Sequence, residues 1–174
     1  MKRRVFIACA AALAASPAMA QDAPSFRFPS IDGGTLNTAD WRGRPVLVVN
    51  TASLCGFTPQ LEGMQALYDE LSPRGLVVLA TPSNDFNQEL DDAKKVREFC
   101  TLQFGITLPM SDIIHVRGDN AHPFWAWVRD SHGFSPNWNF NKVLIGPDGQ
   151  IVDTWRSITG PGSRAIRRQI DPLL

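Results

Sequence analysis

The amino-acid sequence predicts a single α/β domain, and three observations support this class. The chain has 174 residues, which is enough for one domain and leaves little room for two. Two apolar, β-branched runs flank a segment with helical spacing, which is the pattern of a β-α-β unit. Near the C-terminus, a Pro-Asp-Gly turn joins two more strand-like runs.

The first 20 residues have the pattern of a cleaved secretory signal peptide. Positive charges at positions 2–4 precede an apolar stretch over residues 5–15, which is too short to span a bilayer. Ala18 and Ala20 then supply small residues at the spacing that signal peptidase requires. A buried N-terminal helix is the alternative, but it would not require these three features in this order. We expect an exported, periplasmic protein whose mature domain comprises residues 21–174.

The β-α-β unit is the first part of the expected domain. Residues 45–49 and 76–80 form unbroken apolar runs, as expected of parallel strands buried on both faces. Between them, apolar residues recur at helical spacing over residues 61–71. Thr58 is the expected N-cap of this helix, and Pro59 its first helical residue.

Extra helices are expected in the middle of the chain, after an extended lead-in over residues 21–29. One helix is predicted over residues 92–104, with Gly105 as its stop. Asp119 or Asn120 is the expected cap of another short helix.

The C-terminal part is expected to complete the sheet. Strands over residues 142–146 and 150–155 form an antiparallel hairpin, and Ser163 opens a last helix. The order β-α-β, extra helices, β-β-α is that of a thioredoxin-like fold with an insertion between the two units. We therefore expect a central mixed sheet flanked by helices.

Composition excludes several function classes. The 17 basic and 17 acidic side chains balance, so no excess of cations is available to neutralise nucleic-acid phosphates. The three histidines are scattered without metal-ligand spacing, and no H-E-x-x-H motif occurs. We expect no metal and no cofactor, and interpret His122 as a structural residue beside Pro123.

Removal of the signal peptide takes Cys9 with it and leaves Cys55 and Cys100. Cys55 follows a parallel strand and precedes a helix, at the sheet edge where sites form in open α/β folds. A helix N-terminus favours thiolate over thiol, so this position predicts a reactive nucleophile. Two alternatives remain: a structural Cys55–Cys100 disulfide, which an oxidising compartment permits, and a cysteine that merely fills a gap in the core.

The residues around Cys55 disfavour three chemistries. A dithiol oxidoreductase requires C-x-x-C, but Thr58 stands where the second cysteine belongs. A copper carrier of this fold requires two closely spaced cysteines, which the chain lacks. Most peroxiredoxins have threonine three residues before the reactive cysteine, where this chain has Ala52. A peroxidase of another type remains.

Several motifs together resemble the glutathione peroxidase family in its cysteine, non-selenium form. The first motif is NTASLCGFTPQ over residues 50–60. The others, in chain order, are TPSNDFNQE (81–89), EFC (98–100), FGITLP (104–109), NAHP (120–123) and WNFNK (138–142). The resemblance extends over nearly the whole mature chain.

This resemblance implies a role for four residues. Cys55 is the implied peroxidatic cysteine, which attacks the O–O bond and becomes a sulfenic acid. Gln88, Trp138 and Asn139 are the implied N–H donors to its sulfur. Donors aimed at the sulfur and the departing oxygen stabilise the negative charge that develops there.

The sequence departs from the family pattern in the second loop. The family usually has Asn-Gln-Phe-Gly-x-Gln-Glu, whereas this loop is one residue shorter and has Asp85 in place of the first Gln. Gln88 is matched through the Glu that follows it. Ser83 replaces a cysteine that is common in relatives, which removes one candidate resolving thiol.

Cys100 matches the position that resolves the sulfenic acid in many non-selenium relatives, by forming a disulfide with Cys55. Because Cys100 is expected on the inner face of a helix, this reaction requires local unwinding of about one helical turn. The expected reductant is a thioredoxin-like protein or glutathione. The short connection over residues 127–138 lacks the segment that tetrameric relatives use for assembly, so we expect a monomer.

The expected function is reduction of hydrogen peroxide or organic hydroperoxides. One alternative is a periplasmic thiol-disulfide exchange or redox-sensing protein on the same fold. Another is a non-enzymatic domain with a structural disulfide.

Overall fold

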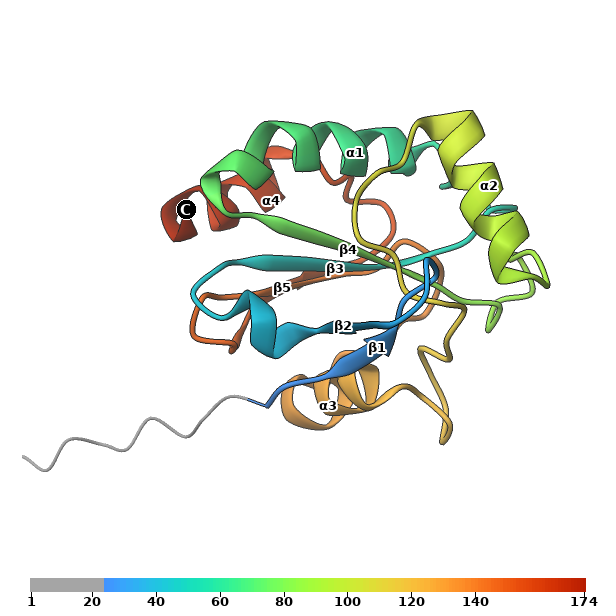
Figure 1. The fold of residues 1–174 in the computed structure, drawn as a ribbon. Helices are drawn as coiled ribbons and strands as arrows, with labels where there is room; N and C mark the ends of the chain where they lie inside the picture. Colours follow the sequence, from blue (N-terminus) through green and yellow to red (C-terminus); the bar gives the residue numbers. More distant parts are fainter. Residues whose placement is uncertain (1–23) are drawn as a thin grey trace, which may run out of the picture.

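The computed structural model describes residues 24–174, and its centre is a mixed four-stranded sheet (Figure 1). The strands, in chain order, are β3 (Val46–Thr51), β4 (Val77–Pro82), β5 (Lys142–Ile145) and β6 (Ile151–Trp155). Their order across the sheet is β4-β3-β5-β6. β3 is parallel to β4 and antiparallel to β5, which is antiparallel to β6. The predicted β-α-β unit and C-terminal hairpin are thus confirmed, while the predicted signal peptide lies outside the described residues.

Helices cover both faces of this sheet (Figure 1). The helices are α1 (Gln60–Leu71), α2 (Ala93–Phe104), α3 (Pro123–His132) and α4 (Arg164–Ile170). α1, α2 and α4 pack on one face, and α3 packs on the other with a small hairpin of β1 (Arg27–Pro29) and β2 (Thr35–Asn37). Three short 3-10 turns are η1 (Thr38–Trp41), η2 (Ser72–Arg74) and η3 (Asp171–Leu173). α2 and α3 form the predicted insertion.

The two parallel strands are buried along their whole length, as their unbroken apolar runs predict. Side chains on a strand alternate between faces, so each strand contributes to two cores. Leu47 and Val49 join the cluster beneath α1, α2 and α4, whereas Val46 and Val48 join the cluster beneath α3. Both faces of the sheet are therefore held by apolar packing, which fixes the loops at its ends.

The first helix of the insertion matches the prediction. The Asp92 side chain caps α2 by accepting a hydrogen bond from the backbone N–H of Lys95 at 2.9 Å. Gly105 ends the helix in the left-handed conformation, with φ of 63°. Within residues 24–174, no helix is long and apolar enough to cross a membrane.

The predicted cap of the second inserted helix is wrong. α3 is capped by His122, not by Asp119 or Asn120. His122 Nδ1 accepts from the backbone N–H of Phe124 at 3.3 Å, while its Nε2 lies 3.0 Å from the Arg27 carbonyl oxygen. His122 thus has the structural role that the sequence suggested, and burial lowers its pKa.

The β1–β2 hairpin was not predicted. The expected extended lead-in pairs through Arg27–Pro29 with Thr35–Asn37, around a turn that contains two glycines with positive φ. Each strand has only three residues, which is too short for an alternating pattern to be visible in the sequence.

Candidate active site

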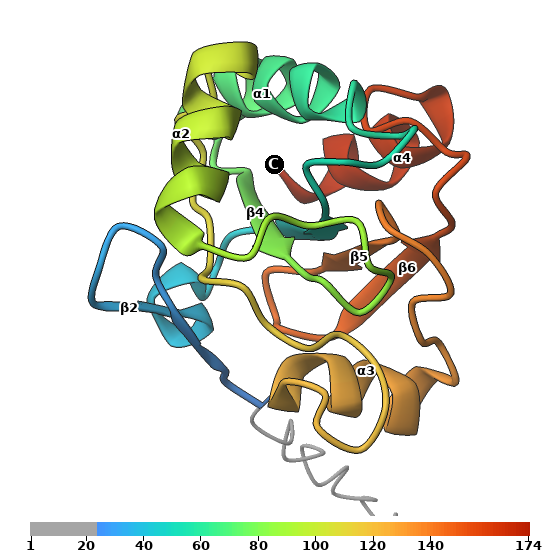
Figure 2. The ribbon, with the colours of Figure 1, turned by 90° about the vertical axis from the view of Figure 1, so that its right-hand side faces the viewer.

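Cys55 lies in the loop that connects the end of β3 to the start of α1. This loop, the loop after β4 and the loop before β5 gather at one end of the sheet, which faces the viewer in Figure 2. The carboxyl ends of the parallel strands β3 and β4 meet at this edge, where sites form in α/β folds. Cys55 is only 7% exposed and is not in a disulfide.

A tight turn holds the sulfur of Cys55. The hydroxyl of Thr58 accepts a hydrogen bond from the Cys55 N–H at 3.1 Å and donates to the Ala52 carbonyl at 2.8 Å. The backbone N–H of Phe57 donates to Cys55 Sγ at 3.4 Å, which stabilises negative charge on the sulfur. Gly56 is exposed, and no atom outside its neighbours would contact a Cβ there, so the approach to this turn is open.

The predicted capping role of Thr58 is wrong. α1 begins at Gln60, and Pro59 occupies the N-cap position without a side-chain hydrogen bond. The Thr58 hydroxyl is unavailable for capping because it closes the turn around Cys55. The threonine that replaces the second cysteine of a C-x-x-C motif therefore orders the loop that carries Cys55.

The structure brings Gln88 and Asn139 together, although 51 residues separate them in the chain. Asn139 Nδ2 donates to Gln88 Oε1 at 3.1 Å, and the Gln88 carbonyl accepts from the N–H of Leu54, next to Cys55, at 2.9 Å. Asn139 is fully buried, and within the described residues no group donates to its Oδ1. A buried acceptor without a partner is rare in protein interiors and typical of a functional position.

In the shortened second loop, which follows β4, Asn84 and Asn87 form a tight turn. Asn87 has φ of 55°, in the left-handed region that asparagine tolerates better than most residues. Its N–H donates to the Asn84 carbonyl at 2.9 Å, and the Asn84 side chain accepts from the N–H of Glu89 at 3.1 Å. This turn places Gln88 beside Asn139 despite the missing residue.

Asp85, the other departure in this loop, fixes the loop to the segment that precedes α3. Its carboxylate lies 2.6 Å from His115 Nδ1 and accepts from the backbone N–H groups of Val116 and Arg117 at 2.6 and 3.2 Å. Burial acts to raise the pKa of Asp85, but these hydrogen bonds outweigh it and hold the pKa below its usual value.

Trp138 is the exposed member of the site, with 39% of its surface accessible. Its ring packs against Phe86, with the centroids 5.5 Å apart. Arg117 covers the Phe86 ring at 4.4 Å in a cation-π contact. The second loop thus supports the indole directly through Phe86.

The backbone of Trp138 is held by two buried asparagines that the sequence analysis did not single out. Asn50 Nδ2 and Asn141 Nδ2 both donate to the Trp138 carbonyl, at 3.0 and 2.7 Å. Asn50 Oδ1 also accepts from the Asn141 N–H at 2.8 Å. A fully buried asparagine at the end of the apolar strand β3 is the signal that could have identified Asn50.

Glu89 anchors the loop before Cys55. Its carboxylate accepts from the backbone N–H groups of Ser53 and Leu90 at 3.0 and 2.9 Å. Burial raises the pKa of this carboxyl. Together with the Gln88 carbonyl, Glu89 connects the second loop to the two residues that precede Cys55.

Cys100 lies on the inner face of α2, in the same apolar cluster as Cys55, and is not in a disulfide. Burial and the nearby charge of Glu89 raise the pKa of Cys100 to about 12. The thiol is therefore protonated and unreactive while α2 is folded.

Comparison with known proteins identifies the family. The family model for glutathione peroxidase matches residues 25–129, more than half of the chain. A glutathione peroxidase of Lactococcus lactis is 39% identical over 154 residues, covering 86% of this chain and 97% of the relative. The chain belongs to the glutathione peroxidase family. A hydroperoxy fatty acid reductase of Synechocystis is 36% identical over 163 residues, covering 86% of this chain and 94% of the relative.

Solved structures agree on the fold of this glutathione peroxidase-family chain. The crystal structure of Trgpx in apo form superposes with a TM-score of 0.67 at 31% identity, covering 85% of this chain and 92% of the other. A thiol:disulfide interchange protein of Chlorobium tepidum superposes with a TM-score of 0.64 at 20% identity, covering 91% and 99%. The latter likeness shows the thioredoxin-like fold alone. The family relationship makes the chain a thiol peroxidase, an oxidoreductase.

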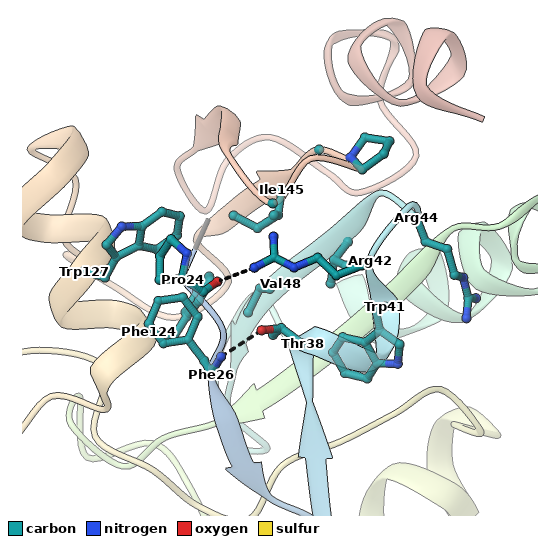
Figure 3. Close-up of a pocket in the computed structure, with 14 residues that line it drawn as sticks. Pro24, Phe26, Thr38, Trp41, Arg42, Arg44, Val48, Phe124, Trp127 and Ile145 are labelled. Atoms are coloured by element: carbon teal, nitrogen blue, oxygen red, sulfur yellow. Dashed lines mark hydrogen bonds between the residues drawn. The ribbon is translucent and has the colours of Figure 1, made fainter. Parts of the chain in front are cut away.

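A pocket lies away from the candidate site, at the opposite end of the sheet. Phe26, Phe124 and Trp127 line it, together with the first residues of β3 and the turn between β5 and β6 (Figure 3). Arg42 donates to the Pro24 carbonyl at 3.2 Å across its mouth. None of the predicted site residues lines this pocket. Within residues 24–174, no group of three or more His, Cys, Asp or Glu side chains is arranged to hold a metal ion.

Proposed function

We propose that Cys55 is the peroxidatic residue of a hydroperoxide reductase. The Cys55 thiolate attacks one oxygen of the substrate, the O–O bond breaks, and the sulfur becomes a sulfenic acid. The leaving oxygen takes a proton and departs as water or an alcohol. One observation carries this proposal: the Phe57 N–H donates to the sulfur of Cys55. The same loop is held by Gln88, whose carbonyl accepts from the Leu54 N–H and whose side chain accepts from Asn139.

Gln88, Trp138 and Asn139 are the proposed donors to the reacting atoms. An amide side chain carries two N–H bonds, and Asn139 uses one of them on Gln88. The second N–H of Asn139 and both N–H bonds of Gln88 remain for the sulfur or the departing oxygen. Such donors contribute most when they are fixed before the reaction begins. The hydrogen bond between Asn139 and Gln88 holds both amide groups in this way.

Cys100 is the proposed resolving residue. Its thiolate attacks the sulfur of the Cys55 sulfenic acid, a disulfide forms, and hydroxide leaves as water. α2 must unwind locally for this step. Val96 and Cys100 are its buried side chains, and Phe99 and Phe104 pack against the same core while partly exposed. Two of its ion pairs, Lys94–Glu98 and Lys95–Asp91, are exposed and contribute little to stability. A third, Arg97–Asp32 at 2.9 Å, joins the helix to the turn between β1 and β2.

A thioredoxin-like dithiol protein is the proposed reductant, with glutathione as the alternative. A dithiol attacks the Cys55–Cys100 disulfide, passes through a mixed disulfide and returns both cysteines to thiols while its own pair is oxidised. Glutathione needs no second cysteine in the enzyme, so an active Cys100 favours the dithiol. We further propose an exported monomer, on the basis of the N-terminal sequence and the short connection before Trp138.

Peroxide consumption with a panel of reductants tests this function. We expect a thioredoxin system to sustain turnover and glutathione to do so poorly. The Cys100→Ser variant should lose thioredoxin-dependent turnover and still react once with peroxide. Efficient glutathione-driven turnover by that variant, without a Cys55–Cys100 disulfide in the wild type, would establish a one-cysteine cycle instead.

Thiol-disulfide exchange on the same fold is the second candidate, because Cys55 and Cys100 are both free thiols and lie in one apolar cluster. Free-thiol counts before and after one equivalent of peroxide separate the candidates. The peroxidase consumes peroxide and both thiols at once. An exchange protein reacts with disulfide substrates first, and a structural disulfide is oxidised and inert from the start.

A further inference from the structure

Lys142 is a fully buried lysine directly behind the proposed site. Its Nζ donates to the side-chain oxygen of Gln60 at 2.5 Å and to the Phe140 carbonyl at 2.8 Å. Both acceptors are neutral, and none of the ion pairs among residues 24–174 includes Lys142.

A buried amine without a carboxylate partner is costly. Burial disfavours the charged ammonium form, and it lowers the pKa of Lys142 to about 7. An apolar side chain of similar volume would avoid this cost. The amine can donate hydrogen bonds in either protonation state. We therefore ask which groups its hydrogen bonds hold in place.

The bonds of Lys142 complete the fixation of the segment that carries Trp138 and Asn139. Side chains donate to three consecutive carbonyls: Asn50 and Asn141 to that of Trp138, Ser157 to that of Asn139, and Lys142 to that of Phe140. Phe140 itself has φ of 62°, which is strained for a bulky residue and requires such support.

Gln60 connects this segment to the element that carries the nucleophile. It is the first residue of α1, and the turn around Cys55 immediately precedes it. Gln60 Oε1 accepts from Lys142, while its Nε2 donates to the Ser157 carbonyl at 2.7 Å. One glutamine therefore joins the start of α1 to two of the residues that fix the Trp138–Phe140 backbone.

We propose that Lys142 and Gln60 are positioning residues for peroxide reduction: their hydrogen bond holds the Trp138–Asn139 donors in register with the Cys55 turn. The inference rests on the proposed function of Cys55. It predicts that breaking this link slows the reaction with peroxide specifically, because the donors lose their aim at the departing oxygen while the nucleophile remains. A misplacement of about 1 Å can cost on the order of 100-fold in rate.

Single-turnover kinetics of the reduced protein with hydrogen peroxide tests the proposal without any reductant. Lys142→Met replaces the buried donor with an apolar side chain of similar length. Gln60→Leu removes the acceptor of the same hydrogen bond, at the half-buried first residue of α1. Glu62→Gln, an exposed change in the same helical turn, is the matched control. Circular dichroism confirms folding, and Gln60→Leu decides the question if Lys142→Met does not fold.

A second rate separates positioning from general damage. Alkylation of Cys55 by iodoacetamide needs the thiolate, to which the Phe57 N–H donates in wild type and variants alike, and it has no departing oxygen for Trp138 and Asn139 to stabilise. We expect both test variants to lose about 10- to 100-fold in the peroxide rate constant, with alkylation close to wild type and the control unchanged in both rates. Peroxide rates equal to the control, or peroxide and alkylation rates that fall in parallel, would overturn the proposal. A wild-type protein that does not react with peroxide at Cys55 would overturn the proposed function itself.

Discussion

At the scale of single residues, the proposed chemistry depends on a few N–H groups that are fixed before peroxide arrives. Trp138 and Asn139 project from a backbone whose carbonyls are held by buried side chains. The Asn139 side chain is also hydrogen-bonded to Gln88, and the Trp138 ring packs on Phe86. We expect Trp138→Phe and Asn139→Ala each to slow the peroxide reaction, because losing one such donor typically costs about 10²–10³-fold. Stopped-flow measurement of the single turnover checks this. Unchanged rates in both variants would show that the donors lie elsewhere.

Lys142 gives a pH dependence of stability at the same scale. The pKa of its amine is lowered from 10.5 to about 7 in the folded protein. Between these values the unfolded chain binds the proton and the folded chain does not, so the free energy of unfolding rises with pH in this window. We expect denaturant titrations to show this rise in the wild type and a flatter profile in Lys142→Met. Parallel profiles for the two proteins would contradict the assignment.

At the scale of elements, the proposed resolving step requires α2 to move. Only two of its side chains are buried, and one of them is Cys100, whose thiol stays protonated while the helix is intact. Hydrogen exchange followed by mass spectrometry tests this movement. We expect the amides of α2 to exchange faster after peroxide treatment of the wild type, and to keep their protection in Cys100→Ser, which cannot form the disulfide. A disulfide that forms with α2 still fully protected would contradict the unwinding step.

At the scale of the whole molecule, the N-terminal sequence predicts export of the protein. The basic start, the apolar stretch and the Ala18–Ala20 pattern predict removal of residues 1–20. We expect intact-mass analysis of the exported protein to give a chain that begins at Gln21. An exported protein that retains Met1 would show that the segment is not a cleaved signal.

The molecule also shows which features a sequence can predict. Unbroken apolar runs and helical spacing predicted β3, β4, α1 and α2, because burial dictates both patterns. The predicted cap of α3 was wrong because the helix begins only at Pro123, where His122 occupies the cap position. The predicted role of Thr58 was wrong because its hydroxyl closes the turn around Cys55. The bond from Asn50 to the Trp138 carbonyl and the bond from Lys142 to the Gln60 side chain could not be predicted, because each joins residues more than 80 positions apart.

The central claim is that Cys55 takes the oxygen from peroxide, and trapping its sulfenic acid tests this most directly. Reduced Cys100→Ser protein receives one equivalent of hydrogen peroxide and a sulfenic-acid trap, and peptide mapping by mass spectrometry locates the adduct. We expect the adduct on Cys55 and none in the Cys55→Ser protein, which should keep its fold and lose peroxidase activity. Peroxide consumption by Cys55→Ser, or a reduced Cys55 that remains unmodified, would contradict the account.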